Sequence, residues 1–322
     1  MNKAYPIAIA ISLIYLVLYV ILGVTGVLFY LETDAEPIGS ISGWCERVTA
    51  GIFRENANAL SNLGFMVAGL LMFRKLTNDE ATNTSKNNFT SLNKLSVLYA
   101  GAAIYLGPGS MLMHGTHTEW GGWADNLSMV MYILFPWLYN LKEMGRWSSN
   151  KFLQVYFSIV IVYAVARWFF GGRLGIGLDL FGLSIGLWVI SETLYRFWSP
   201  AFRWASGLVG FVVAAVFGIT PMEIFSDLKT FWWVALFWVP AIFASEKPRI
   251  ERTYTPWFFM GMASYMIAFA IWLQGQPNNP SIFTEQMCNP DSLIQPHAIW
   301  HLLTAYATWC FFMFFRTEKQ VS

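Results

Sequence analysis

The sequence predicts an all-α, polytopic transmembrane helix bundle. Of its 322 residues, 56% are hydrophobic and only 12% are charged, and the mean hydropathy is +0.47. Apolar runs of roughly 20 residues recur along the chain, which is the length that an α-helix needs to cross a bilayer. This composition excludes an ordinary soluble domain, and the net charge of +1 indicates no surface for nucleic acid.

Ten hydrophobic ranges are expected to form helices. The first follows Lys3 and lacks a persuasive small-residue cleavage site, so we predict an uncleaved helix rather than a signal peptide. Two ranges, 205–220 and 231–245, are short for a bilayer of about 30 Å and are expected to be tilted, re-entrant or packed inside the bundle. Eight spans would fit the loop charges as well as ten. In order, the ranges are 7–30, 56–73, 95–113, 124–140, 152–170, 176–197, 205–220, 231–245, 256–274 and 296–315.

The charges of the loops predict the orientation. The connections 31–55, 114–123 and 275–295 together hold only two basic residues, Arg47 and Arg54. Both termini are therefore predicted to be cytoplasmic. The short loops and the lack of a retention signal favour a bacterial inner-membrane protein, with a eukaryotic endomembrane protein as the alternative. Basic residues gather in the other connections, at Arg74, Lys75, Lys86, Lys94, Lys142, Arg146, Lys151, Arg196, Arg203, Lys247, Arg249, Arg252, Arg316 and Lys319.

All four histidines lie in two windows, His114 with His117 and His297 with His301, with 179 residues between the windows. The predicted topology returns both windows to the non-cytoplasmic, or periplasmic, face. His297 and His301 are one helical turn apart, which is a common way to present two imidazoles to zinc. Ionisable groups at membrane depth usually mark a functional site. We therefore predict that zinc binds His114, His297 and His301, and that His117, out of helical register, is not a ligand.

Two further polar residues are predicted at the same face. Ser110 lies one turn before His114, and Asp125 begins the next helix after a glycine-rich turn. Three imidazoles leave a fourth zinc position for water, as in catalytic sites, and a nearby carboxylate can take the proton of that water. Other interpretations remain. Asp125 could instead be favoured by the helix dipole, and Ser110 could be a small packing residue between helices.

Three motifs of this sequence resemble the alkaline ceramidase family, part of a superfamily of seven-helix membrane hydrolases that also includes adiponectin-type receptors. The resemblance implies a seven-helix ceramidase-like core over residues 44–316, preceded by an extra transmembrane helix within residues 1–32. Additional residues before the last motif are interpreted as an inserted hairpin near 200–250, which gives about 8–10 spans. The motifs are Gly107-Pro-Gly-Ser110-x3-His114-x10-Asp125, His297-x3-His301, and Trp44-Cys45-Glu46 followed by Glu55-x2-Asn58-x2-Ser61-Asn62.

The resemblance implies a zinc-dependent lipid amidase. Zinc would be held by His114, His297 and His301. Asp125 would deprotonate the attacking water, and Ser110 would help to stabilise the oxyanion. The substrate would be a ceramide-like N-acyl membrane lipid, cleaved to a fatty acid and a sphingoid base. Three alternatives remain: a zinc-containing receptor or sensor, a lipid esterase on the same scaffold, and a haem protein with His114 and His301 as axial ligands.

The resemblance also implies a disulfide between Cys45 and Cys288. Both residues fall in predicted non-cytoplasmic loops, where oxidation is allowed. Cys310 lies inside the last hydrophobic range and is interpreted as a buried free thiol. Three unpaired thiols are the alternative.

Eukaryotic members of the family carry a calcium site in the Trp-Cys-Glu segment. Trp44, Glu46 and Glu55 correspond to part of that site. However, Gly43 and Val48 stand at two other ligand positions, and the two glutamates are two residues closer together than in the family. The resemblance therefore implies zinc but does not carry over a complete calcium site.

Overall fold

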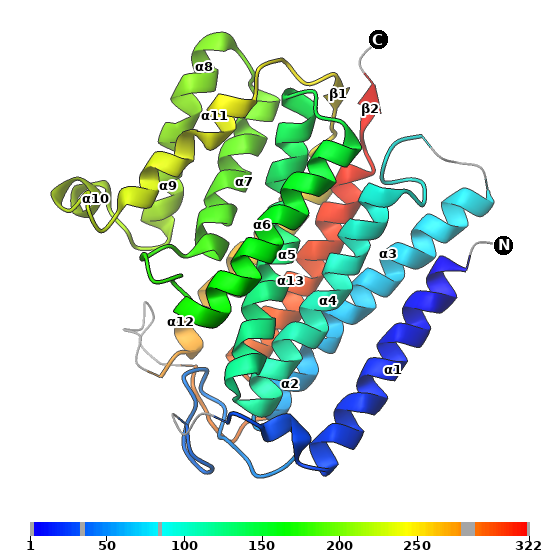
Figure 1. Cartoon of the computed structure of the whole chain (residues 1–322), viewed down its shortest axis with the longest axis vertical. Coiled ribbons are helices and arrows are strands. Elements are labelled where there is room, and N and C mark those ends of the chain that lie inside the picture. The colour runs from blue at the N-terminus through cyan, green and yellow to red at the C-terminus, as the bar shows by residue number, and fades with distance from the viewer. Residues whose placement is uncertain (1–2, 33–35, 83–85, 278–286, 321–322) are drawn as a thin grey trace. The chain divides into compact units, whose positions relative to one another are not determined.

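The computed structural model describes residues 3–32, 36–82, 86–277 and 287–320, and the regular secondary structure of these residues is almost entirely helical (Figure 1). The predicted all-α class is confirmed, since the two strands have only two residues each. Every one of the ten predicted ranges contains helix. Among the described residues, six helical stretches are long and apolar enough to cross a membrane, and the two predicted short ranges overlap shorter apolar stretches, Pro200–Val216 and Trp232–Phe243.

The chain divides into two compact units, and the division falls inside helix α5 (Glu119–Met144) after Ser128. The first unit contains α1 (Ala4–Val24), η1 (Val27–Phe29), α2 (Asn56–Ser61), α3 (Leu63–Ala81), α4 (Lys94–Thr116), the start of α5, α12 (Trp257–Gly275) and α13 (Pro296–Phe315). The second contains the rest of α5, α6 (Ser149–Phe170), α7 (Leu180–Arg196), α8 (Pro200–Ala205), η2 (Ser206–Leu208), α9 (Val209–Val216), α10 (Pro221–Ser226), η3 (Trp232–Trp238), α11 (Val239–Phe243) and β1 (Ile250–Glu251). The strand β2 is Lys319–Gln320. The separate inserted hairpin stays a prediction.

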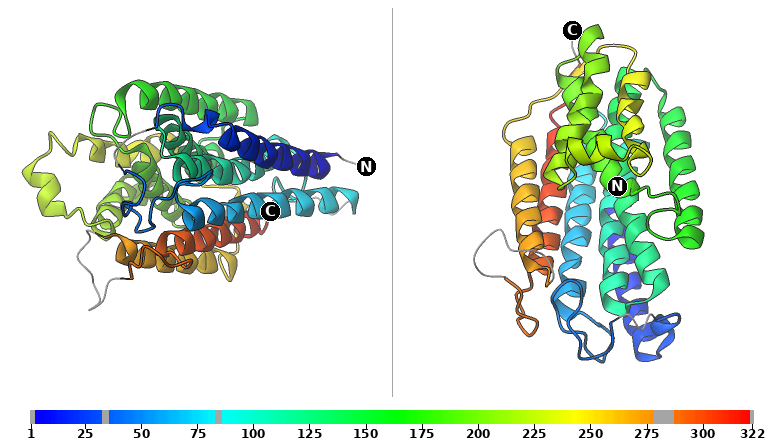
Figure 2. Two further views of the ribbon diagram at one scale, coloured as in Figure 1. Left: turned by 90° about the horizontal axis from the view of Figure 1, so that it is seen from below. Right: turned by 90° about the vertical axis from the view of Figure 1, so that its left-hand side faces the viewer.

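In the first unit, α13 packs against α12, α3 and α2, and α4 packs against α3 and α2. Figure 2 shows α12 and α13 running side by side. Small residues permit this close packing. A Cβ atom at Gly69 of α3 would lie 2.9 Å from the carbonyl oxygen of Ala100 in α4. Such contacts are typical of helices that associate in membranes.

Helix α4 has a capped start and a glycine-rich segment in its second half. Asn93 begins the helix with a capping box, which satisfies amide groups that have no partner within the helix. A Cβ atom at Gly107 would lie 2.9 Å from the carbonyl oxygen of Asn62, and one at Gly109 would lie 2.8 Å from that of Ala124 in α5. The two glycines therefore let α4 approach a neighbour on each side, immediately before the residues of the predicted site.

Helix α1 lies within residues 1–32, where an extra N-terminal helix was predicted, and it contacts the segment that leads into α2. Tyr19 is buried, stacks on Phe53 with 5.1 Å between ring centroids, and donates a hydrogen bond to the carbonyl oxygen of Ile52 (2.8 Å). After the helix, Glu32 forms an ion pair with Arg54 (2.6 Å). These contacts hold the backbone in place just before Glu55, one of the predicted site residues.

The second unit has its own buried polar contacts. Tyr156 of α6 donates to the carbonyl oxygen of Met131 in α5 (2.6 Å). The side-chain amide of Asn140 donates to Ser191 and Glu192 of α7 at 3.1 and 3.0 Å. Buried polar groups need such partners, because leaving them unpaired in an apolar bundle costs free energy.

Candidate metal centre

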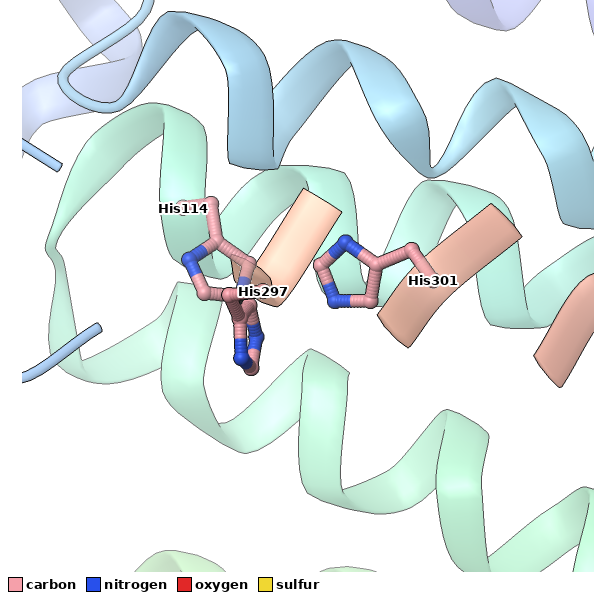
Figure 3. A group of neighbouring side chains, drawn as sticks. All are labelled: His114, His297 and His301. Atoms are coloured by element: carbon pink, nitrogen blue, oxygen red, sulfur yellow. The ribbon is translucent and has the colours of Figure 1, made fainter. Parts of the chain in front are cut away.

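Three of the four histidines converge between two helices that are remote in sequence. His114 is in the last turns of α4, and His297 and His301 are in the first turns of α13; Figure 3 shows their rings close to one another. The ring centroid of His114 is 4.7 Å from that of His297 and 5.1 Å from that of His301. The centroids of His297 and His301 are 4.5 Å apart. All three side chains are buried, with 2%, 7% and 4% of their surface exposed. The structure therefore brings together the three residues that were predicted to hold zinc.

The geometry of these imidazoles suits a metal ion. One nitrogen from each ring can be chosen so that all three lie within 4.8 Å of one another. His114 Nε2 and His297 Nε2 are 3.0 Å apart, and two nitrogens on a tetrahedral zinc ion at about 2.0–2.1 Å would lie about 3.3 Å apart. Among the described residues, His297 Nδ1 is buried without a hydrogen-bond partner. The donor set is therefore compatible with zinc after small shifts.

Partners of the outer ring nitrogens orient two of the imidazoles. His114 Nδ1 donates to a carboxylate oxygen of Glu55 (2.9 Å). His301 Nδ1 lies 2.8 Å from Ser61 Oγ and 3.2 Å from the carbonyl oxygen of Asn58. Because the Ser61 hydroxyl itself donates to that carbonyl (2.8 Å), it accepts from His301. Because these partners hold the protons at Nδ1, both Nε2 lone pairs are left for a metal, as is common where a ligating histidine donates its other ring proton to a carboxylate or a carbonyl.

Aromatic rings cover the histidines. The Trp44 ring meets the rings of His114 and His297 edge to face, with 5.7 Å between centroids in each case. Phe65 of α3 lies against His301 at 6.2 Å. An apolar cover of this kind limits the access of bulk water, and electrostatic interactions inside it are strengthened.

Glu46 and Glu55 are the two glutamates that correspond to part of the family's calcium site, and each has its own set of contacts. Both oxygens of Glu46 accept from backbone amides at the start of α2, Ala57 N (2.7 Å) and Asn58 N (2.8 Å). Burial raises the pKa of Glu46, although these two amides act in the opposite direction. A carboxylate at this position stabilises the positive end of a helix. Calcium binding by Trp44, Glu46 and Glu55 stays a prediction.

Glu55 accepts hydrogen bonds from three side chains of the centre. Its Oε2 accepts from His114 Nδ1 and from the side-chain amide of Asn58 (2.6 Å), and its Oε1 accepts from His117 Nε2 (2.7 Å). Burial alone would raise the pKa of Glu55, but His114 and His117 hold this pKa below its usual range. Glu55 therefore orients His114 and connects it to His117.

The remaining predicted site residues are buried on neighbouring helices. Ser110 lies one turn before His114 on α4, and Asp125 lies in the first turns of α5. Asp125 interacts electrostatically with His114 and with Tyr105. Asp125 therefore lies close enough to His114 to interact with it, and Ser110 shares the helix of His114.

The predicted disulfide is present. Cys45 and Cys288 are bonded, with 5.5 Å between their Cα atoms, and Cys310 is buried and free, as expected. The bond is supported by Arg47, whose side chain makes two hydrogen bonds to Asp291 at 2.6 and 2.8 Å. These links connect the segment before α2 with the segment before α13, and both segments lead into the histidine cluster.

The contacts that Glu55, Asn58 and Ser61 make with the histidines were not predicted from the sequence. A signal was present, because the three residues follow one another at intervals of three, as residues on one face of a helix start do. Nothing in that spacing indicates which histidine they contact. Ser61 and His301 are 240 positions apart in the sequence, and only the packing of α2 against α13 brings them together.

Three imidazoles that converge inside a bundle of membrane-length helices define a multi-pass membrane protein with a buried site able to hold a metal ion. In a comparison with protein-family models, residues 36–321 match the family described as Ceramidase. The chain belongs to the ceramidase family and has its helical membrane fold. Helix α1 precedes the matched residues. A comparison with curated proteins gave no match.

Proposed function

We propose that this protein is an intramembrane zinc-dependent hydrolase that cleaves the amide bond of a ceramide-like N-acyl lipid to a fatty acid and a sphingoid base. The observation that carries the proposal is the buried convergence of His114, His297 and His301 in a chain of the ceramidase family. Imidazole nitrogens are suitable ligands for zinc, and three of them leave a position for water or substrate.

The residues around the imidazoles are suited to amide hydrolysis. A bound zinc ion would supply Lewis acidity, which polarises a carbonyl group and lowers the pKa of a water molecule. Asp125 accepts a proton as the water oxygen bonds to the acyl carbon, and it returns that proton to the amide nitrogen as the carbon–nitrogen bond breaks. Its electrostatic contact with His114 supports this role.

We assign to Ser110 the stabilisation of the carbonyl oxygen of the substrate amide. Its hydroxyl lies on the same helix as His114, one turn earlier, and its side chain is buried. A hydroxyl there donates a hydrogen bond to the oxygen as negative charge develops on it. A donor of this kind contributes most when water is excluded, and Trp44 and Phe65 cover the neighbouring imidazoles.

The position of the site along the helices suits a lipid substrate. The histidines lie where α4 ends and α13 begins, at the ends of two membrane-length helices. The amide of an N-acyl sphingoid lipid lies near the headgroup level, whereas its two chains stay in the hydrocarbon. We propose from the loop charges that both termini are cytoplasmic and that the site faces the periplasm of a bacterial inner membrane.

The test is to purify the protein in detergent, measure its metal content by mass spectrometry, and incubate it with N-acyl sphingoid lipids of several chain lengths. Lysolipid esters form a second panel, which separates an amidase from an esterase. We expect bound zinc and release of fatty acid from the amides. Zinc without fatty-acid release from either panel would refute the enzymatic proposal and favour a receptor or sensor with the same centre.

A further inference from the structure

The fourth histidine does not belong to the three-histidine group, but it contacts the carboxylate that orients one of its members. We propose that His117 is a positioning residue that holds Glu55 against His114 and thereby increases the affinity of the centre for zinc. This inference rests on the proposed function, because it concerns the same metal centre.

The position of His117 depends on an uncommon backbone conformation. His117 ends α4 with a φ angle of +53°, in the left-handed region that few residues other than glycine, asparagine, aspartate and histidine adopt. Its backbone amide still bonds to the carbonyl oxygen of Met113 (2.9 Å), which closes the last turn of the helix. The imidazole is then out of register with His114 and reaches the other oxygen of Glu55.

The contacts of Glu55 show what the imidazole contributes. Glu55 is 1% exposed, and its Oε2 is shared by His114 and Asn58. Among the described residues, the hydrogen-bond donor at Oε1 is His117 Nε2. Without that donor, one oxygen of a buried carboxylate would lose its partner, and the carboxylate could rotate away from His114. Buried groups that lose a partner reorganise because the unpaired state is costly.

A second carboxylate lies on the far side of the imidazole. His117 Nδ1 is 3.4 Å from an oxygen of Glu36, and the other oxygen of Glu36 accepts from the backbone amide of Gly43 (2.6 Å). Ligand atoms of Glu36, Glu55 and His117 lie close enough to hold a metal ion. However, each ring nitrogen of His117 already faces a carboxylate oxygen, so the group is explained as a chain of contacts: Glu36 to His117, His117 to Glu55, and Glu55 to His114.

The experiment measures zinc affinity in the full-length protein by competition with a chelator, without any lipid substrate. His117→Asn keeps a residue that tolerates the left-handed conformation, and His117→Gly removes the side chain while relaxing the backbone. We expect both variants to bind zinc more weakly, by up to the roughly 10–100-fold found when the direct partner of a ligating histidine is lost, because Glu55 would no longer be held against His114. The absorption bands of the cobalt-substituted protein should shift in both, since the orientation of His114 changes.

A matched control is Glu36→Gln, at the outer end of the same chain of contacts, for which we expect a smaller loss than for either His117 variant. If His117 only ended the helix, His117→Gly would keep the affinity and the cobalt spectrum of the parent protein. Unchanged affinity in both folded His117 variants would overturn the inference and leave the proposed function intact. A parent protein that takes up no zinc would overturn both together.

Discussion

Helix α13 carries a buried polar group near each end, and the two groups differ in how their members are paired. After its C-terminal end, Arg316 pairs with Asp79, and the nearby Arg252 pairs with Glu318 at 3.0 Å with both side chains fully buried. At its N-terminal end, three imidazoles face one another. His301 and Arg316 are 15 residues apart, which is about 22 Å along the helix at a rise of about 1.5 Å per residue.

This difference in pairing distinguishes a structural group of ion pairs from a candidate metal-binding site. At the C-terminal end each cation has an anion beside it, so the charges balance within the protein. At the N-terminal end His114 Nε2 and His297 Nε2 are 3.0 Å apart, and two lone pairs that face each other repel unless a proton or a metal ion lies between them. Buried ion pairs whose charges balance within the protein indicate a structural role. Imidazole nitrogens that converge on one another indicate a site that binds a metal ion.

The largest expected effect is at the histidine end. His301→Ala removes a ligand from α13, and we expect the zinc content to fall from about one per chain to near zero, with fatty-acid release at background. The measurement is metal analysis of folded, monodisperse protein. Ser264→Ala, which removes a different polar contact of α13, to the carbonyl oxygen of Leu303, is the control and should keep its zinc. Retention of zinc by His301→Ala would place the metal elsewhere.

Asp125→Asn should separate chemistry from metal binding. The substitution keeps the size of the side chain but removes the proposed proton acceptor, so we expect turnover to fall by about 10²–10⁴-fold. Zinc content should stay near that of the parent protein, because Asp125 is not a ligand in this account. Steady-state kinetics and metal analysis on one preparation check both points. Turnover within a few-fold of the parent would show that another group accepts the proton.

A substitution at the C-terminal end of α13 should affect stability rather than zinc binding. Glu318→Gln leaves the buried Arg252 guanidinium without its anion, and breaking such a pair typically costs about 3–5 kcal/mol. We expect a lower midpoint of thermal or denaturant unfolding in detergent and an unchanged zinc content in the protein that remains folded. A loss of zinc without a loss of stability would contradict the distinction between the two ends.

The smallest effect is expected from the disulfide, which joins residues 243 positions apart. Cys45→Ser with Cys288→Ser should reduce stability by about 2–4 kcal/mol. It should also weaken zinc binding modestly, since both segments lead into the histidine cluster. Cys310→Ser, at the free thiol, is the matched control. Equal unfolding midpoints and equal zinc affinity in the double variant and the control would refute a supporting role for the bond.

The sequence predicted the helices well where hydrophobicity decides them and less well at their ends. Helix α3 continues to Ala81, beyond the predicted limit of 73, and α5 spans Glu119–Met144 rather than 124–140. Hydropathy marks the part of a helix that lies in lipid, whereas the helix itself continues through polar residues that hydrogen-bond its ends in water.

For the site, the sequence predicted the residues whose spacing follows a helix. His297 and His301 share a face because they are four residues apart, and the topology placed His114 beside them. It could not predict that His117 contacts Glu55, because that contact depends on a left-handed backbone at a histidine. Nor could it predict that Ser61 contacts His301, since this pairing depends on the packing of helices remote in sequence.

The central claim is tested most directly by the zinc content of the purified parent protein, measured by mass spectrometry beside that of His297→Ala. We predict about one zinc per folded chain in the parent and almost none in the variant. The claim would be contradicted by far less than one zinc per chain in a folded parent protein that was purified without any chelator. Equal zinc in the two proteins would contradict it as well.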